Sequence, residues 1–257
     1  MLRIFALLIS IAFTLNLDAQ KLGFDVDYEN GRIQNTYLVE NNFVFKIHSS
    51  GNINAIYIFE NESEAKDFVL DPRTQFLPRK RLSLGGGVTI YLNAFESIEY
   101  CKNYSTYSRA GIVGEICSID NLDIEYNLKI GNNSTIGIVG KLKSIGPYTI
   151  KYHTNYSSNV AAGIMGKVES IGNTKFTYWG KYSSSDTGNY TGHLKQIDNI
   201  SIKYHENYSG NKGFTGKIKS IGNINFNYYK NYSTNNSMGV VGKFKNREES
   251  DARLIIL

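Results

Sequence analysis

Cys101 and Cys117 are the only cysteines in the chain, and their spacing suggests a covalent bond. Both stand at solvent-side positions of alternating segments joined by a loop, so we expect them on adjacent strands and on one side of a sheet. Because the N-terminus reads as an export signal, we also expect an oxidising compartment. The spacing therefore predicts a cross-strand disulfide closing a loop of about 15 residues, worth about 3 kcal/mol in the chain-entropy model. Two free thiols are the alternative.

The four histidines are the next candidates, since imidazoles bind transition metals. His193 and His205 have the spacing of opposite positions in one hairpin, whereas His153 and His205 would lie about 19 Å apart in a sheet. No thiol or carboxylate is placed to serve as a third ligand, and two imidazoles alone hold a metal weakly. We therefore predict no metal and no cofactor.

The same hairpin positions place lysines opposite aromatic rings elsewhere in the chain. The predicted pairs are Lys141–His153, Lys167–Trp179 and Lys217–Tyr229, with about 0.5–1 kcal/mol per exposed cation–ring contact. Residues 140–246 contain fourteen lysines and four acidic residues. Such a face suits an anionic polysaccharide or another cell-surface component rather than nucleic acid, although lysine also simply solubilises exposed strands. The candidate ligand face comprises Lys141, His153, Lys167, Trp179, His193, His205, Lys217 and Tyr229.

A catalytic set is not visible in the sequence. Serines recur at one position of each repeat, where packing or turn formation explains them, and no histidine stands at a matching position. The glycine run at 84–87 lacks the lysine and helix of a phosphate-binding loop. We therefore predict that the chain is not an enzyme. A secreted hydrolase, the enzymatic alternative, would need the acidic run between Glu60 and Arg81, which a solvated charged segment also explains.

These residues are positioned by a block that recurs about every 26 residues. Marker glycines are followed by nearly the same text, as in GKLKSIGPYTIKYHTNYSS and GKIKSIGNINFNYYKNYST. A fixed period of this kind indicates a repeat architecture, in which each unit buries its hydrophobic face against its neighbours. The marker glycines are Gly114, Gly140, Gly166, Gly192, Gly216 and Gly242.

Hydrophobic and polar residues alternate within each block, which indicates strands with one buried face. The expected buried positions lie two, ten and twelve residues after the marker glycine, and the last of these is an unbroken tyrosine column. Gly-Asn, Gly-Pro or Asp-Asn between the strands indicates tight hairpins. We therefore predict an all-β fold, an antiparallel meander of tandem β-hairpin repeats of about 26 residues that forms one large twisted sheet.

The pairing register follows from the requirement that buried residues share a face. In one hairpin, strict alternation predicts Leu142 opposite Tyr152 and Ser144 opposite Ile150. Residues 146–148 then form a three-residue loop.

The ends of the chain differ from the array. Residues 1–20 read as a signal peptide, so we expect a location in the periplasm, at the cell surface or outside the cell. Residues 21–87 are interpreted as a degenerate repeat region, interrupted at 60–81 by an excursion with a helical turn near 63–68. The array covers 88–246, and residues 247–257 form a tail, either a last strand or a loose segment.

The text GKIKSIGN, followed by a strand of the I-x-Y-Y type, resembles tandem hairpin repeats of uncharacterised secreted bacterial proteins. It is also similar to the Gly- and Tyr-rich hairpins of MORN and YD repeats. The resemblance covers residues 45–245 without the excursion and implies a non-catalytic extracytoplasmic scaffold or binding surface. We therefore expect an exported or surface-associated β-repeat protein with a structural or binding role. An outer-membrane β-barrel is the alternative, disfavoured by the short strands and by lysines beside the marker glycines.

Overall fold

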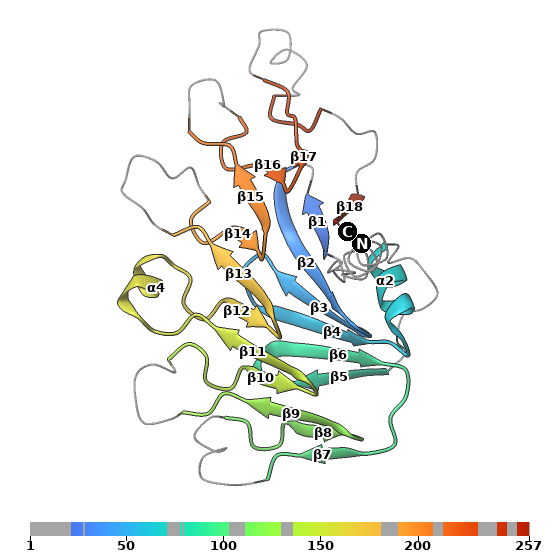
Figure 1. Cartoon of the computed structure of the whole chain (residues 1–257). Helices are drawn as coiled ribbons and strands as arrows, with labels where there is room; N and C mark the ends of the chain where they lie inside the picture. Colours follow the sequence, from blue (N-terminus) through green and yellow to red (C-terminus); the bar gives the residue numbers. More distant parts are fainter. Residues whose placement is uncertain are drawn as a thin grey trace, which may run out of the picture.

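Two β-sheets packed face to face make up most of the molecule (Figure 1). This computed structural model describes residues 22–27, 29–70, 78, 80–102, 111–129, 136–180, 190–207, 213–230 and 241–245, and the backbone of 251–256. The predicted signal peptide, residues 1–20, lies outside the described residues. Side chains from the facing sides of both sheets form one hydrophobic core.

The first sheet contains seven strands in the order β18-β1-β2-β3-β4-β6-β5. All neighbours are antiparallel except β4 and β6, which run parallel. The C-terminal segment thus supplies an edge strand beside β1, one of the two outcomes expected for the tail. The strands are β1 (Leu22–Asp27), β2 (Arg32–Glu40), β3 (Phe43–His48), β4 (Ile53–Ile58), β5 (Lys80–Leu84), β6 (Val88–Leu92) and β18 (Asp251–Ile256).

Helix α2 (Glu62–Leu70) covers the outer face of the seven-stranded sheet. Its buried residues Ala65, Phe68 and Val69 pack against Tyr37 and other side chains of that face in a second hydrophobic cluster. The helix begins after Asn61, whose side chain accepts a hydrogen bond from the backbone N–H of Glu64 at 3.0 Å. The excursion predicted near 63–68 is therefore a full helix of nine residues.

The second sheet contains eleven antiparallel strands in strict chain order, from β7 to β17, which confirms the predicted meander of hairpin repeats. Its first strand begins at Ile98, because β6 belongs to the other sheet rather than to the array. A short helix, α4 (Ser157–Ala161), lies in the connection after β11. The strands are β7 (Ile98–Tyr100), β8 (Ile116–Ile119), β9 (Leu122–Tyr126), β10 (Leu142–Ile145), β11 (Tyr148–Tyr152), β12 (Val168–Ile171), β13 (Thr174–Tyr178), β14 (Leu194–Ile197), β15 (Ile200–Tyr204), β16 (Ile218–Ile221) and β17 (Ile224–Asn225).

The predicted pairing register is wrong by one residue. Ser144 pairs with Thr149 and Ile145 with Tyr148, so the turn has two residues instead of three. Leu142 and Tyr152 nevertheless face the same core, with exposed fractions of 0% and 5%.

A β-bulge reconciles these two findings. On the other side of β10, Leu142 pairs with Tyr126 and Ser144 pairs with Glu125. Lys143 therefore has no partner residue on β9 and forms the bulge. The corresponding shift recurs in the β12, β14 and β16 pairings. Because a bulge resets the alternation of side chains, both the first and the fourth residue of these strands face the core.

The bulge adds a buried column that strict alternation misses. It lies five residues after each marker glycine and is isoleucine in every described repeat: Ile119, Ile145, Ile171, Ile197 and Ile221. The three columns that alternation predicts are largely buried as expected, including the tyrosines Tyr126, Tyr152, Tyr178, Tyr204 and Tyr228.

Candidate functional site

Three hairpin turns of the seven-stranded sheet reach across to the start of a repeat in the eleven-stranded sheet. They lie between β1 and β2 at Gly31, between β3 and β4 at Gly51, and between β5 and β6 at the 3-10 turn Gly85–Gly87. Each turn meets a marker glycine or the lysine that follows it. The repeat that starts at Gly192 receives none of the three turns.

The Gly51 turn docks on the repeat that starts at Gly166. The backbone N–H of Val168 donates to the carbonyl of Gly51 at 2.8 Å, and Lys167 Nζ donates to the carbonyl of Ser50 at 2.7 Å. The same ammonium group lies 5.4 Å from the ring centroid of Tyr178. Lys167 therefore joins the two sheets.

The Gly31 turn docks in the same way two repeats further along. Ile218 N–H donates to the carbonyl of Gly31 at 2.8 Å. Lys217 Nζ donates to the carbonyls of Glu29 and Gly242 at 2.6 and 2.7 Å, and it lies 5.6 Å from the Tyr228 ring.

Lys141 lies beside the third turn, where a Cβ on Gly86 would come within 3.2 Å of Lys141 Cα, but its ammonium group bonds to the Gly51 turn. Its ammonium group donates to the carbonyl of Gly166 at 2.6 Å and to Asn52 Oδ1 at 2.7 Å, and it lies 5.3 Å from the Tyr152 ring. A Cβ on Gly86 would come within 3.2 Å of the Gly140 carbonyl, so this turn also fits closely. Partial burial lowers the pKa of all three docking lysines, Lys141, Lys167 and Lys217.

The expectation that these lysines lie on the open face is therefore wrong, because the open face of the array is the opposite one. The predicted cation–ring pairs are also displaced by one residue. Each lysine lies over the tyrosine that precedes the predicted partner, and Trp179 is instead contacted by Lys195 at 5.0 Å. The one-residue error in the hairpin register explains the displacement.

The predicted opposition of His193 and His205 fails for the same reason. His205 N–H donates to the carbonyl of Lys217, and Trp179 N–H donates to the carbonyl of His193, so each pairs with the neighbouring hairpin. Within the described ranges, no three His, Cys, Asp or Glu side chains gather as metal ligands. His153, Trp179, His205 and Tyr229 are half-buried, and the first three contact aromatic or lysine side chains of the array.

His193 takes the place of the docking lysine in the repeat that starts at Gly192. This repeat lies between those that receive the Gly51 and Gly31 turns. A pocket of about 520 Å³ opens here between the sheets. Its hydrophobic wall is formed by Ile33, Ile47, Phe176 and Leu194.

The mouth of the pocket is polar and mostly cationic. Arg32 and Lys167 line it, together with Asp27 and neutral hydrogen-bonding side chains such as Asn30 and Gln34. Burial lowers the pKa of His193 to about 4, and the nearby charges of Arg32 and Lys167 act in the same direction. His193 is therefore neutral at neutral pH.

Tyr178 also lines the pocket, but its hydroxyl oxygen is inaccessible to solvent. In two other repeats the equivalent tyrosine hydroxyl donates to the backbone carbonyl ten residues earlier. Tyr126 donates to Ile116 at 2.8 Å, and Tyr204 donates to Leu194 at 2.9 Å. The Tyr178 hydroxyl is fully buried, yet it has no hydrogen-bond partner among the described residues. Burial raises the pKa of this phenol, so it remains protonated and is a potential donor.

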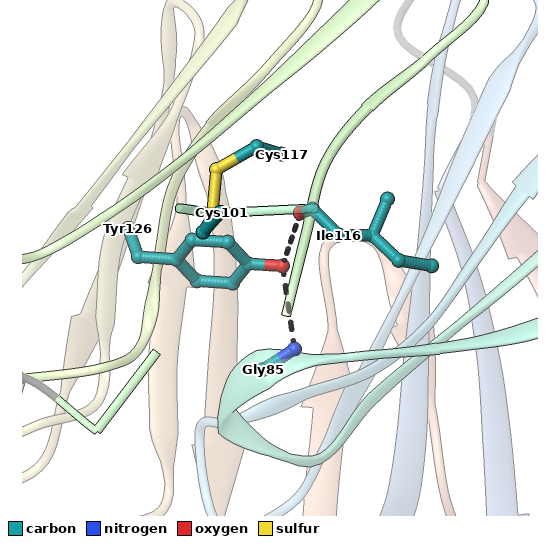
Figure 2. The surroundings of a disulfide bond; sticks show 5 residues. All are labelled: Gly85, Cys101, Ile116, Cys117 and Tyr126. Carbon is teal, nitrogen blue, oxygen red and sulfur yellow. Dashed lines mark hydrogen bonds between the residues drawn. A yellow bond between two sulfur atoms is a disulfide. The ribbon is translucent and has the colours of Figure 1, made fainter. Parts of the chain in front are cut away.

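The disulfide between Cys101 and Cys117 is present, as predicted, with a Cα–Cα distance of 5.1 Å. Figure 2 shows the Tyr126 ring beside it, with the phenolic oxygen donating to the Ile116 carbonyl and accepting from Gly85 N–H at 3.4 Å. Cys101 is buried rather than solvent-facing, with an exposed fraction of 4%. The bridge therefore strengthens the first repeat at the place where the β5–β6 turn reaches it.

Comparison with protein-family models, curated proteins and solved structures found no match to this chain. Among the helices that the structure describes, none combines the length and hydrophobicity needed to cross a membrane. The resemblance to secreted hairpin-repeat proteins stays a prediction.

Sequence reasoning named His193 and Lys167 but missed the pocket itself. The signal was available in the aligned repeats, since histidine interrupts the lysine that follows Gly140, Gly166, Gly216 and Gly242. Arg32 could not be found in this way, because it lies outside the array and has no aligned position in the repeats.

Proposed function

We propose that this chain is an exported, non-catalytic binding protein whose repeat array is a rigid frame for the pocket at His193. The pocket takes a polar ligand about the size of one or two sugar rings. The predicted signal peptide and the disulfide between Cys101 and Cys117 support a location outside the cytoplasm, where such bonds persist.

The observation that carries this proposal is the pocket itself. Its volume of about 520 Å³ lies within the range of about 300–1,000 Å³ typical of small-molecule sites. A hydrophobic wall below a polar mouth suits a ring with one apolar face and several hydroxyl groups. Binding is favoured over catalysis because the carboxylate at the mouth, Asp27, already accepts hydrogen bonds from Glu29 N–H and Asn30 N–H, at 2.9 and 3.1 Å.

A ligand-observed NMR screen tests the proposal. The screen uses a library of mono- and disaccharides, neutral and acidic, against the wild-type protein and two blocked variants, Gln34→Trp at the rim and His193→Trp in the wall. We expect saturation transfer to at least one compound, lost in both variants while their thermal unfolding stays cooperative. Binding that persists in both variants, or no binding at millimolar ligand, would overturn the proposal. Gln34 is exposed, so its variant tests the pocket even if His193→Trp fails to fold.

A second candidate function is electrostatic attachment to an anionic polymer through the outer face of the array. Lys151, Lys175 and Lys203 alternate with buried neighbours on β11, β13 and β15, and all three are exposed on that outer face. Salt-dependent retention on heparin, reduced in the triple glutamine variant, is the expected result. Retention unchanged by the three substitutions would eliminate this function.

A further inference from the structure

The charges around the pocket mouth are unequal. Arg32 and Lys167 line it, and Lys217, whose pKa is lowered chiefly by burial, lies near both Asp27 and Arg32. The one carboxylate among the lining residues, Asp27, is engaged in the β1–β2 turn, and the amides of Asn30 and Gln34 also donate to it. An approaching anion therefore meets a net positive mouth.

Arg32 is the cation in this group that is available to a ligand. The ammonium groups of Lys167 and Lys217 already donate to backbone carbonyls. Arg32 is exposed, and it forms no ion pair with any carboxylate in the described part of the chain. A guanidinium presents its donors in a planar fork that matches the two oxygens of a carboxylate.

His193 extends this recognition into the pocket. The neutral imidazole of His193 lies 5.3 Å from the Tyr204 ring, centroid to centroid, and offers one donor and one acceptor nitrogen without adding a competing charge. A ligand oxygen or hydroxyl that reaches the imidazole can accept from one ring nitrogen or donate to the other.

Building on the proposed function, on which this step rests, we propose that the ligand carries a carboxylate bound by the guanidinium of Arg32. The rest of the ligand is a polyol ring lying against the hydrophobic wall, with hydroxyl groups toward His193. This is the chemistry of a sugar acid of the hexuronate type, either free or at the end of an acidic polysaccharide.

Isothermal titration calorimetry with galacturonic acid, its trimer and the methyl esters of both tests this at pH 7. We expect the acids to bind at least about tenfold more tightly than the esters, because a charge-assisted pair is lost on esterification. Arg32→Gln should weaken binding of the acids about tenfold or more and leave the esters unchanged. Arg81→Gln is the matched control, an exposed arginine on β5, and should bind the acids as wild type does.

Equal affinity for acid and ester would overturn the carboxylate inference, and so would an equal loss for both in Arg32→Gln. If neither probe binds while a neutral saccharide of the library does, the carboxylate inference fails and the pocket function stands. If the whole library also fails, the proposed function falls with it. Among supporting outcomes, tighter binding of the trimer indicates a polysaccharide end, and equal binding of monomer and trimer indicates the free sugar acid.

Discussion

The repeat that starts at Gly166 and the one that starts at Gly192 have nearly the same strands, yet only the first is covered by a turn of the opposing sheet. In the first, Lys167 and Val168 bind the carbonyls of Ser50 and Gly51. In the second, His193 faces a pocket. The difference shows that the same repeat backbone either docks on the opposing sheet or lines a pocket, depending on whether a turn reaches it.

The largest loss of stability is expected from Gly51→Ala, in the turn that covers the Gly166 repeat. Gly51 has φ of +82°, and a Cβ there would lie 2.7 Å from Lys167 Cβ, so both backbone strain and a clash follow. We expect a loss of about 3 kcal/mol in the free energy of unfolding, measured by urea denaturation. Gly87→Ala is the control, with φ of +78° but no atom within 4 Å, and should cost about 1 kcal/mol. Equal losses in the two variants would mean that the Gly51 turn does not depend on close contact with Lys167.

A smaller effect is expected from Lys167→Met, which keeps the hydrophobic stem over Tyr178 but removes the bond to the Ser50 carbonyl. Because Ser50 is exposed and water can replace the ammonium group, we expect a loss of only about 1 kcal/mol in unfolding free energy. Lys175→Met, an exposed position on β13, should change it by less than about 0.5 kcal/mol. A loss in Lys167→Met no greater than in Lys175→Met would show that the docking lysine contributes nothing.

At neutral pH the smallest effect is expected from His193, whose titration changes stability only as the pH falls. The pKa of His193 is lowered from its ordinary value of 6.5 to about 4, chiefly by burial, so between these values the unfolded chain binds a proton that the folded protein does not. The free energy of unfolding should therefore fall as the pH drops from about 6.5 toward 4. Burial also lowers the pKa values of His153 and His205, which adds to the fall.

The variant His193→Gln should make this decline shallower, as followed by thermal unfolding between pH 7 and 4. Lys175→Gln, at an exposed position on β13, is the control for substitution as such and should retain the wild-type slope. If His193→Gln and wild type lose stability in parallel, the imidazole of His193 does not titrate as its burial indicates.

The fold of the array could be predicted from its sequence because the buried columns repeat at fixed positions. Leu142 and Tyr152 share the core face as alternation requires. The register between them could not be predicted, because the bulge at Lys143 is a backbone feature with no distinctive residue type. The isoleucine three residues after Leu142 was the available signal, since strict alternation would have left it exposed.

The pocket depends on pairing between distant segments, and for that reason the repeats alone did not reveal it. Nothing in the local sequence of Gly31 or Gly51 indicates which repeat each turn contacts. The disulfide was predictable because Cys101 and Cys117 lie on neighbouring strands of one meander, where chain order determines proximity. The docking lysines were predicted on the open face of the array. That prediction was wrong because alternation shows which residues share a face but not whether a second sheet covers that face.

The placement of the three turns has a consequence for how such molecules diversify. Successive turns of the seven-stranded sheet meet the repeats starting at Gly216, Gly166 and Gly140, so they skip one repeat and then none. The turns of one sheet and the repeats of the other are therefore spaced differently. A repeat stays uncovered wherever no turn lies opposite it. A homologue with more hairpins in both layers would therefore contain further uncovered repeats.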